Sequence, residues 1–170
     1  MKIIMGLICF LFLISIYLVA EPVNLDGNYI YLPEQSEDVF AAIDETVSTM
    51  SFITRPIARR RLRNTNEPYQ SIDIITKTDS VFIATDGKPA VKTNLDGSSK
   101  RWTREDGEEF EVTTIFKDNS LRQSFVAEDG KRVNEYIGSE KGLELRVTIT
   151  SSKLKQPLTY RLQYQRIDGQ

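Results

Sequence analysis

The chain has 170 residues, with 22 Lys and Arg against 24 Asp and Glu, and therefore a slight net negative charge of −2. This length fits one domain of ordinary size. The chain contains no histidine, which excludes Ser-His-Asp and Cys-His nucleophilic sites and removes the commonest ligand of zinc, copper and iron. We therefore expect a protein that is not an enzyme, with no catalytic residues, no metal site and no cofactor.

Residues 3–20 form an apolar run that follows the single basic residue Lys2. A basic start, an apolar run and a small residue such as Ala20 before a polar chain are the layout of a secretory signal peptide. Leu18 is larger than the residue usual two positions before the cut, and eighteen apolar residues are just enough to span a bilayer. An uncleaved membrane anchor is therefore the alternative.

We expect residues 1–20 to be this signal peptide or anchor and residues 21–170 to form one domain, exported to a periplasmic or extracellular location. The only cysteine, Cys9, lies in the leader, so the domain has no disulfide and depends on its core for stability.

The first elements predicted after the leader are one strand and two short helices. The strand Leu25–Leu32 is rich in Tyr and Ile. Ser36 is a good N-cap for the first helix, whose apolar residues recur at helical spacing: Val39, Ile43, Val47 and Met50. The second helix runs from Arg55 to about Arg63, with a proline in its first turn.

From Pro68 onward the sequence alternates between apolar and polar residues, with Asp-Gly and Asn turns between the segments. Nine strands are predicted there: Tyr69–Lys77, Ser80–Thr85, Ala90–Asn94, Lys100–Arg104, Glu109–Lys117, Ser120–Ala127, Arg132–Gly138, Leu143–Ser151 and Leu158–Arg166. A sheet with one apolar face needs a cover or must close on itself, and no late helix is available. The predicted fold is therefore mainly β: an antiparallel meander β-barrel of about ten strands, with a two-helix lid between strands 1 and 2.

This order of elements, over nearly the whole chain after the leader, resembles the fatty-acid-binding proteins of the calycin, or lipocalin-type, β-barrels. The passage "EPYQSIDIITKTDSVFIAT" is similar to the family's entry from the lid into its second and third strands, and "NSLRQSFVAEDGKRVNEY" to its "KL-x-Q" strand and the strand that follows. The resemblance implies a small hydrophobic or amphipathic ligand inside the barrel.

The last strand departs from the carboxylate-binding members, which carry Arg and Tyr two residues apart on the inward face. Here Arg161 and Tyr164 are three apart and lie on opposite faces of the strand. If Tyr164 points in, Arg161 points out. A substitute cation is Arg104, which shares a face with Trp102. The alternative is that Arg104 pairs at the strand end with Glu105 or Asp106.

The side chains expected to line a cavity face inward on these strands: Trp102, Arg104, Phe110, Gln123, Phe125, Tyr160 and Tyr164. A ten-stranded barrel is wider than the eight-stranded case that side chains just fill, which favours a cavity. The alternative is that the aromatic residues fill a packed core. An acidic turn at Glu105–Glu111 offers carboxylates for acid–base chemistry, but a solvated turn between two strands is the simpler interpretation.

The second helix gathers five arginines, Arg55, Arg59, Arg60, Arg61 and Arg63. With Ile57, Ala58 and Leu62 against the barrel, they would form a basic surface for an anionic membrane. They could equally pair with Asp38, Asp44 and Glu45 on the first helix. Nucleic acid is not expected as a partner, because the chain is acidic and no nucleic-acid module is recognisable.

Two functions follow. The first is an exported, monomeric, non-enzymatic protein that binds a small lipid-like molecule in its barrel. The second is a structural or interaction protein of the cell envelope, with a filled barrel and the arginine-rich helix docked on an anionic partner.

Overall fold

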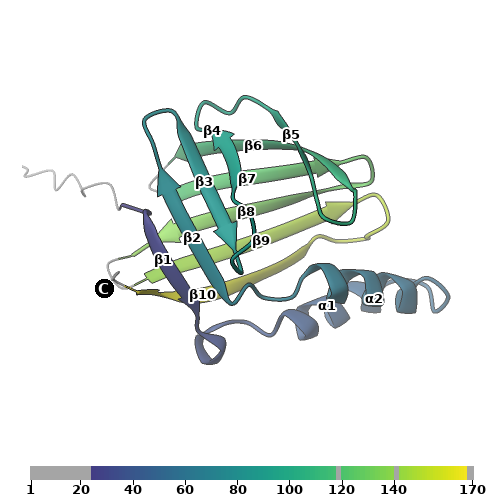
Figure 1. The fold of residues 1–170 in the computed structure, drawn as a ribbon. Helices are drawn as coiled ribbons and strands as arrows, with labels where there is room; N and C mark the ends of the chain where they lie inside the picture. The colour runs from purple at the N-terminus through teal and green to yellow at the C-terminus, as the bar shows by residue number, and fades with distance from the viewer. Residues whose placement is uncertain (1–23, 118–119, 140–141, 168–170) are drawn as a thin grey trace, which may run out of the picture.

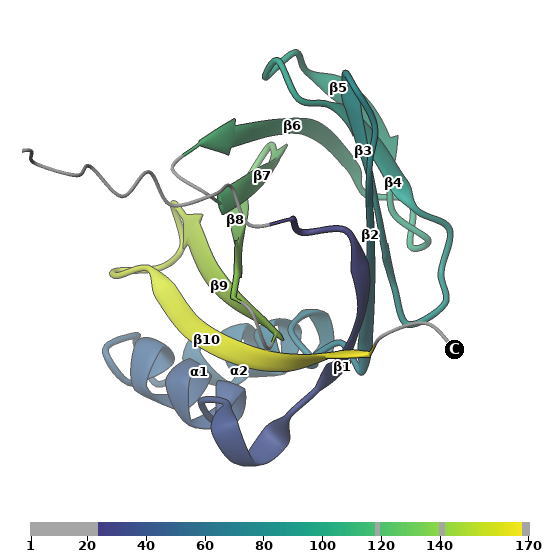
Figure 2. The ribbon, with the colours of Figure 1, turned by 90° about the vertical axis from the view of Figure 1, so that its left-hand side faces the viewer.

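The computed structural model describes residues 24–117, 120–139 and 142–167. The predicted leader, residues 1–20, lies outside them. In the described residues, ten antiparallel strands form one sheet that curves into a nearly closed barrel (Figures 1 and 2). The strands are β1 (Gly27–Tyr31), β2 (Ser71–Thr76), β3 (Ser80–Thr85), β4 (Val91–Asn94), β5 (Lys100–Thr103), β6 (Glu109–Lys117), β7 (Ser120–Ala127), β8 (Gly130–Gly138), β9 (Gly142–Ser151) and β10 (Leu158–Ile167).

The strand order around the sheet is β4-β3-β2-β1-β10-β9-β8-β7-β6-β5. Each strand pairs with its neighbour in sequence except β4 with β5, and β1 also pairs with β10 and so joins the two ends of the chain. Every strand lies within two residues of its predicted bounds. The predicted fold class is confirmed.

The barrel has its seam between β4 and β5, which end the strand order on either side. Here β4 approaches β6 instead. The hydroxyl of Thr93 donates to the hydroxyl of Thr114 at 2.7 Å, with both side chains buried, and Asp96 forms an isolated bridge with Ile115. One buried hydroxyl pair and one bridge therefore close the seam.

Two helices, α1 (Val39–Ser48) and α2 (Arg55–Thr65), lie beneath one end of the barrel (Figures 1 and 2). The N-cap of α1 is Asp38, not Ser36 as predicted: its carboxylate accepts from the backbone N–H groups of Phe40 and Ala41 at 2.9 and 3.1 Å. Ser36 instead follows a short 3₁₀ helix, Pro33–Gln35.

The hydroxyl of Ser36 donates to the carbonyl of Leu32 and accepts from the backbone N–H of Gln163. Ser36 therefore ties the segment before α1 to β10, because a hydroxyl can donate to one backbone group and accept from another.

The two helices are attached to the barrel in different ways. From α1, Val39, Ile43 and Val47 are buried in the same apolar cluster as the barrel interior. By contrast, α2 has no buried residue, and only Ala58 and Leu62 pack partly against that cluster. Burial of apolar surface therefore holds α1 in place and contributes little to α2.

The seam makes a testable prediction. Thr114→Val leaves the buried hydroxyl of Thr93 without a partner, which costs about 1–3 kcal/mol of unfolding free energy. The double variant Thr93→Val/Thr114→Val removes both polar groups and should recover part of this loss. Urea denaturation of the unaltered protein, the single variants Thr93→Val and Thr114→Val, and the double variant measures the effect. A double variant less stable than the sum of the two single losses would contradict a direct hydroxyl pair.

Candidate functional site

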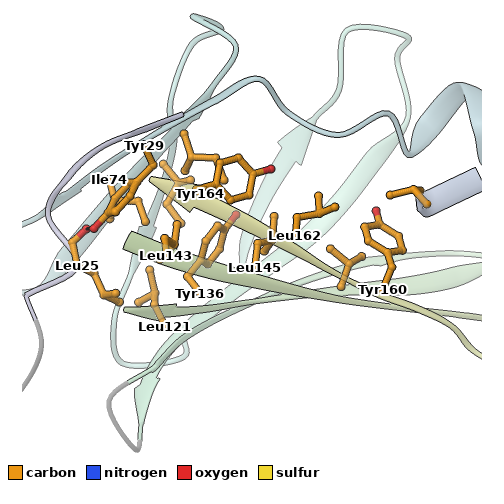
Figure 3. Packing of buried hydrophobic residues seen from close by; sticks show 14 of the residues in the cluster. Leu25, Tyr29, Ile74, Leu121, Tyr136, Leu143, Leu145, Tyr160, Leu162 and Tyr164 are labelled. Carbon is orange, nitrogen blue, oxygen red and sulfur yellow. Dashed lines mark hydrogen bonds between the residues drawn. The ribbon is translucent and has the colours of Figure 1, made fainter. Parts of the chain in front are cut away.

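The interior of the barrel differs between its two ends. At the end away from the helices, here called the far end, bulky residues are at most 2% exposed and leave little room between them (Figure 3): Tyr29, Tyr136, Leu143, Leu145, Leu162 and Tyr164. At the other end, here called the helix end, Trp102, Phe110 and Phe125 face inward but keep part of their surface exposed. The helix end is therefore the more open half of the interior.

Three of the predicted cavity residues form one aromatic cluster at the helix end. The ring centroid of Trp102 lies 5.7 Å from those of Phe110 and Phe125, and the Phe110 and Phe125 rings are 6.2 Å apart and nearly perpendicular. Cross-strand pairing places them together. Trp102 on β5 is directly opposite Phe110 on β6, and Phe125 on β7 is opposite Val112, which is two residues from Phe110 on the same face of β6. These residues form an apolar wall with accessible surface.

Arg104 lies at the edge of this wall and is already paired. Its guanidinium donates to Asp106 at 2.6 Å and to Glu108 at 2.5 Å, and it lies 5.3 Å from the centre of the Phe110 ring. The hydrogen bond from Arg104 holds the pKa of Asp106 at about 2. The strand-end pairing weighed from the sequence is what the structure has, with Glu108 rather than Glu105 as the second partner.

A different arginine, Arg132 on β8, lies inside the helix end. Its Nε donates to the side-chain oxygen of Asn134 at 2.8 Å, and Nη1 donates to Asn66 Oδ1 at 3.0 Å and to the carbonyl of Thr65 at 3.4 Å. Nη2 donates to the hydroxyl of Tyr160 at 3.4 Å. Arg132 was not among the residues predicted to line the cavity, although strand alternation from Tyr136 puts it on the inward face.

The remaining cavity candidates occupy different depths. Tyr160 is at the helix end, where its hydroxyl donates to Asn66 Oδ1 at 3.1 Å. Gln123 is buried one row deeper, opposite Asn134, and Tyr164 is at the far end beside Tyr31. The Gln123 Nε2 and Tyr164 hydroxyl atoms are buried without a hydrogen-bond partner. The structure thus brings together the candidates of the helix end and separates Tyr164 from them.

Burial also sets the ionisation of the interior tyrosines. It raises the pKa of Tyr136, Tyr160 and Tyr164 above the ordinary value, and for Tyr160 the nearby Arg132 opposes that rise. Their hydroxyls are therefore neutral donors and acceptors at neutral pH.

The five arginines of α2 divide into two sets. Arg55, Arg59 and Arg63 recur every four residues and face α1. Arg59 and Arg63 each lie 2.9 Å from a carboxylate oxygen of Asp44. Arg55 donates to the carbonyl of Ser48, the last residue of α1, and to that of Met50 in the loop that follows. These three arginines connect the two helices, as one of the two alternatives predicted.

Arg60 and Arg61, on the other face of α2, are exposed. Arg61 lies 3.8 Å from Glu108, and Lys88 lies 3.1 Å from Glu105. These two ion pairs connect the turn between β5 and β6 to α2 and to the turn between β3 and β4. The three segments surround the helix end.

The prediction that Ile57 packs against the barrel is wrong. Ile57 is 70% exposed, because the packed positions Ala58 and Leu62 are four residues apart and Ile57 lies about 100° away from Ala58 around the helix. Phe52 and Ile53, in the loop before α2, are 82% and 64% exposed. Together with Arg60 and Arg61 they give the tip of the helix pair an apolar and basic surface. A shallow depression of about 550 Å³ lies along α2, lined by Pro56, Ile57, Arg60, Arg61 and Asn64.

The part of the chain that the structure describes holds no group of three or more metal-binding side chains. Within the same residues, no helix combines the length and the apolar character needed to cross a membrane.

Comparison with known proteins places the fold. No protein-family model matches the chain, and no curated protein sequence does. Several solved structures match over nearly their whole length. An abundant heat soluble (SAHS) protein from Ramazzottius varieornatus is 12% identical, with 84% of this chain and 95% of that one covered and a TM-score of 0.59. Human cRBP IV is 18% identical (86% and 100% covered, TM-score 0.54), and a fatty acid binding protein from Schistosoma mansoni in complex with arachidonic acid is 16% identical (84% and 96% covered, TM-score 0.53). The resemblance in fold expected from the sequence is confirmed.

The division of the arginines can be tested by charge reversal. Arg59→Glu places a carboxylate beside Asp44 and should loosen the α1–α2 pair, seen as faster amide hydrogen exchange in both helices. The matched control is Arg60→Glu, one residue along the same helix but on its exposed face, which should leave the exchange rates near those of the unaltered protein. Equal effects of the two substitutions would refute the assignment of Arg59 to the helix contact.

The buried tyrosines predict alkaline sensitivity. In the unfolded chain they ionise with the ordinary tyrosine pKa of about 10, whereas burial in the folded state raises the pKa of Tyr136, Tyr160 and Tyr164. Their contribution to stability is therefore complete below about pH 10 and is lost as the pH rises through the raised values. Tyrosinate absorbance and circular dichroism, followed together, should show these tyrosines ionising only as the barrel unfolds. Ionisation of every tyrosine near this pH in a folded barrel would contradict their burial.

Proposed function

We propose that this protein is a non-enzymatic binding protein that holds a small hydrophobic or amphipathic molecule at the helix end of its barrel. The observation that carries the proposal is the aromatic cluster of Trp102, Phe110 and Phe125, which faces the interior and yet keeps accessible surface. Apolar surface of this kind is favourable to cover, at about 25 cal/mol per Å² removed from water.

The packing of the far end limits the ligand. Tyr29, Tyr136 and Tyr164 are buried among leucines there, so a ligand that reached the far end would have to displace them. A short or partly inserted molecule fits this interior better than a long one. The interior thus combines a packed far end with accessible aromatic surface at the helix end.

Two further arguments support a lipid-like ligand. Structural neighbours of this chain include a fatty acid binding protein in complex with arachidonic acid. In addition, α2 covers the helix end without burying any of its own residues, so it can move aside at small cost to the core. We also propose that the protein is exported, because of the apolar segment 3–20 that follows Lys2.

A second proposed activity is docking on an anionic membrane. Phe52, Ile53 and Ile57 are exposed apolar residues at the tip of the helix pair, and the exposed Arg60 and Arg61 lie beside them. Apolar side chains that enter the interface next to basic residues are typical of peripheral membrane helices. Each basic residue near an anionic leaflet adds about 1 kcal/mol of attraction. Docking at this tip would bring the helix end close to the lipid from which a ligand is taken.

Ligand binding can be tested through Trp102, the only tryptophan. A fluorescent lipid probe should bind, change the Trp102 emission and be displaced by fatty acids. Phe110→Ala should weaken binding about tenfold or more, because it removes a large apolar contact. The matched control is Phe116→Ala, on the same strand and six residues away from Phe110. If native mass spectrometry finds no ligand and no probe binds, the proposed function is wrong.

Membrane docking can be tested by vesicle co-sedimentation. Binding to anionic vesicles should fall as salt is raised, because the Debye length is about 8 Å at physiological ionic strength and shorter above it. The double variant Arg60→Glu/Arg61→Glu should bind less than the unaltered protein. The double variant Lys100→Glu/Arg122→Glu, at exposed positions of β5 and β7, makes the same change in net charge away from this surface and is the matched control. Binding that responds to neither salt nor the double variant would exclude this surface.

A further inference from the structure

We propose that Arg132 is an anion-binding site inside the helix end, which takes the carboxylate of an amphipathic ligand whose apolar part lies on Trp102, Phe110 and Phe125. This inference rests on the proposed function and adds the chemistry of the ligand's polar group. Four features of Arg132 carry it: its charge, its free hydrogen-bond capacity, its position and its access.

The charge of Arg132 is not balanced by a nearby acid. Among the described residues, the hydrogen-bond partners of Arg132 are all neutral: Asn134, Thr65, Asn66 and Tyr160. No carboxylate of these residues lies within ion-pair distance of its guanidinium. A buried or partly buried charge is costly unless it is paired and hydrogen-bonded. Arg104, by contrast, is neutralised by Asp106 and Glu108. An anionic ligand would supply the missing charge at Arg132.

Among the described residues, the guanidinium of Arg132 leaves one N–H group without an acceptor, and a second makes only a long contact. Of its five N–H groups, Nε bonds Asn134, and Nη1 bonds Asn66 and the carbonyl of Thr65. Nη2 makes only one long contact of 3.4 Å, to the hydroxyl of Tyr160. The Nη2 side can therefore receive a carboxylate oxygen, and guanidinium groups bind carboxylates with charge-assisted hydrogen bonds.

The position of Arg132 joins this cation to the aromatic cluster. Arg132 lies directly opposite Phe125 on the neighbouring strand and opposite Ile149 on the other side. Phe125 in turn contacts Trp102 and Phe110. A molecule with its acid group at Arg132 would thus place its apolar part over these rings.

The last strand supplies no such cation at the helix end. Arg161 faces outward and binds Glu37, with its Nη2 2.6 Å from the Glu37 carboxylate. The inward arginine of that strand, Arg166, lies beyond Tyr164 at the far end, where it donates to the carbonyls of Asn24 and Asp26 and lies over the ring of Tyr29. Among the described strand residues, Arg132 is therefore the inward arginine without an ion pair that lies at the helix end, close to the aromatic cluster.

Access to Arg132 is through α2. Arg132 keeps some accessible surface, and its Nη1 contacts are to Thr65 and Asn66, at the carboxyl end of α2. A purely structural role is the competing explanation, in which Arg132 only fastens the end of this helix to the barrel wall. The two explanations differ in what happens when the charge of Arg132 is neutralised and its contacts are kept.

The test compares two probes of equal chain length, dodecanoic acid and dodecanol, by titration calorimetry at neutral pH with the domain of residues 21–170 and with the full chain. The unaltered protein should bind the acid about tenfold more tightly than the alcohol, as expected for hydrogen bonds to a charged group. Arg132→Gln should abolish this preference and leave dodecanol binding within about twofold.

A second variant, Asn134→Asp, keeps Arg132 and places an isosteric carboxylate on its Nε. The Tyr136 hydroxyl, which accepts from Asn134, can turn to donate to that carboxylate, so the variant should fold. Loss of acid binding with retained alcohol binding in this variant supports the proposal and excludes a purely structural role.

The remaining outcomes each decide a different point. Equal affinity for acid and alcohol in the unaltered protein, or acid binding that survives both substitutions, would overturn the anion site and leave the proposed function standing. Failure of the unaltered protein to bind either probe would overturn both.

Discussion

A ten-stranded sheet with one apolar face must close on itself, and the space that it encloses must then be filled. Here the filling is uneven. Tyr29, Tyr136 and Tyr164 fill the far end with leucines around them, whereas the aromatic side chains of the helix end remain partly exposed. Large side chains of one sequence thus divide the interior into a packed half, which stabilises the fold, and a half in which Trp102, Phe110 and Phe125 keep accessible surface.

The helix end is covered by polar contacts rather than by packing. Arg59 and Arg63 join α2 to α1 through Asp44, and Arg132 joins the end of α2 to the barrel wall through Asn66. Partly exposed ion pairs contribute little free energy and are weakened by salt. The cover therefore has a defined orientation at modest stability.

Alternation of apolar and polar residues predicted the strands of the barrel closely. The side-chain period of two is a local property of the sequence, and the longer strands repeat it often enough to be recognised. Contacts between elements were harder to predict. Helical spacing alone did not show that Ala58 and Leu62, and not Ile57, pack on the barrel. Asp38 replaced Ser36 as N-cap because Ser36 bonds β10. Arg132 was missed because its partners, Asn66 and Tyr160, lie 66 and 28 residues away.

Because α2 buries none of its residues, the amino acids on its outer face are not constrained by the core. Substitutions there can accumulate with little effect on unfolding free energy, as is usual for surface positions away from special contacts. The barrel interior and the outer surface of α2 can therefore diverge independently in related sequences. For protein engineering, this allows the outer face of the helix to be redesigned for a new target while the barrel and its contents stay the same.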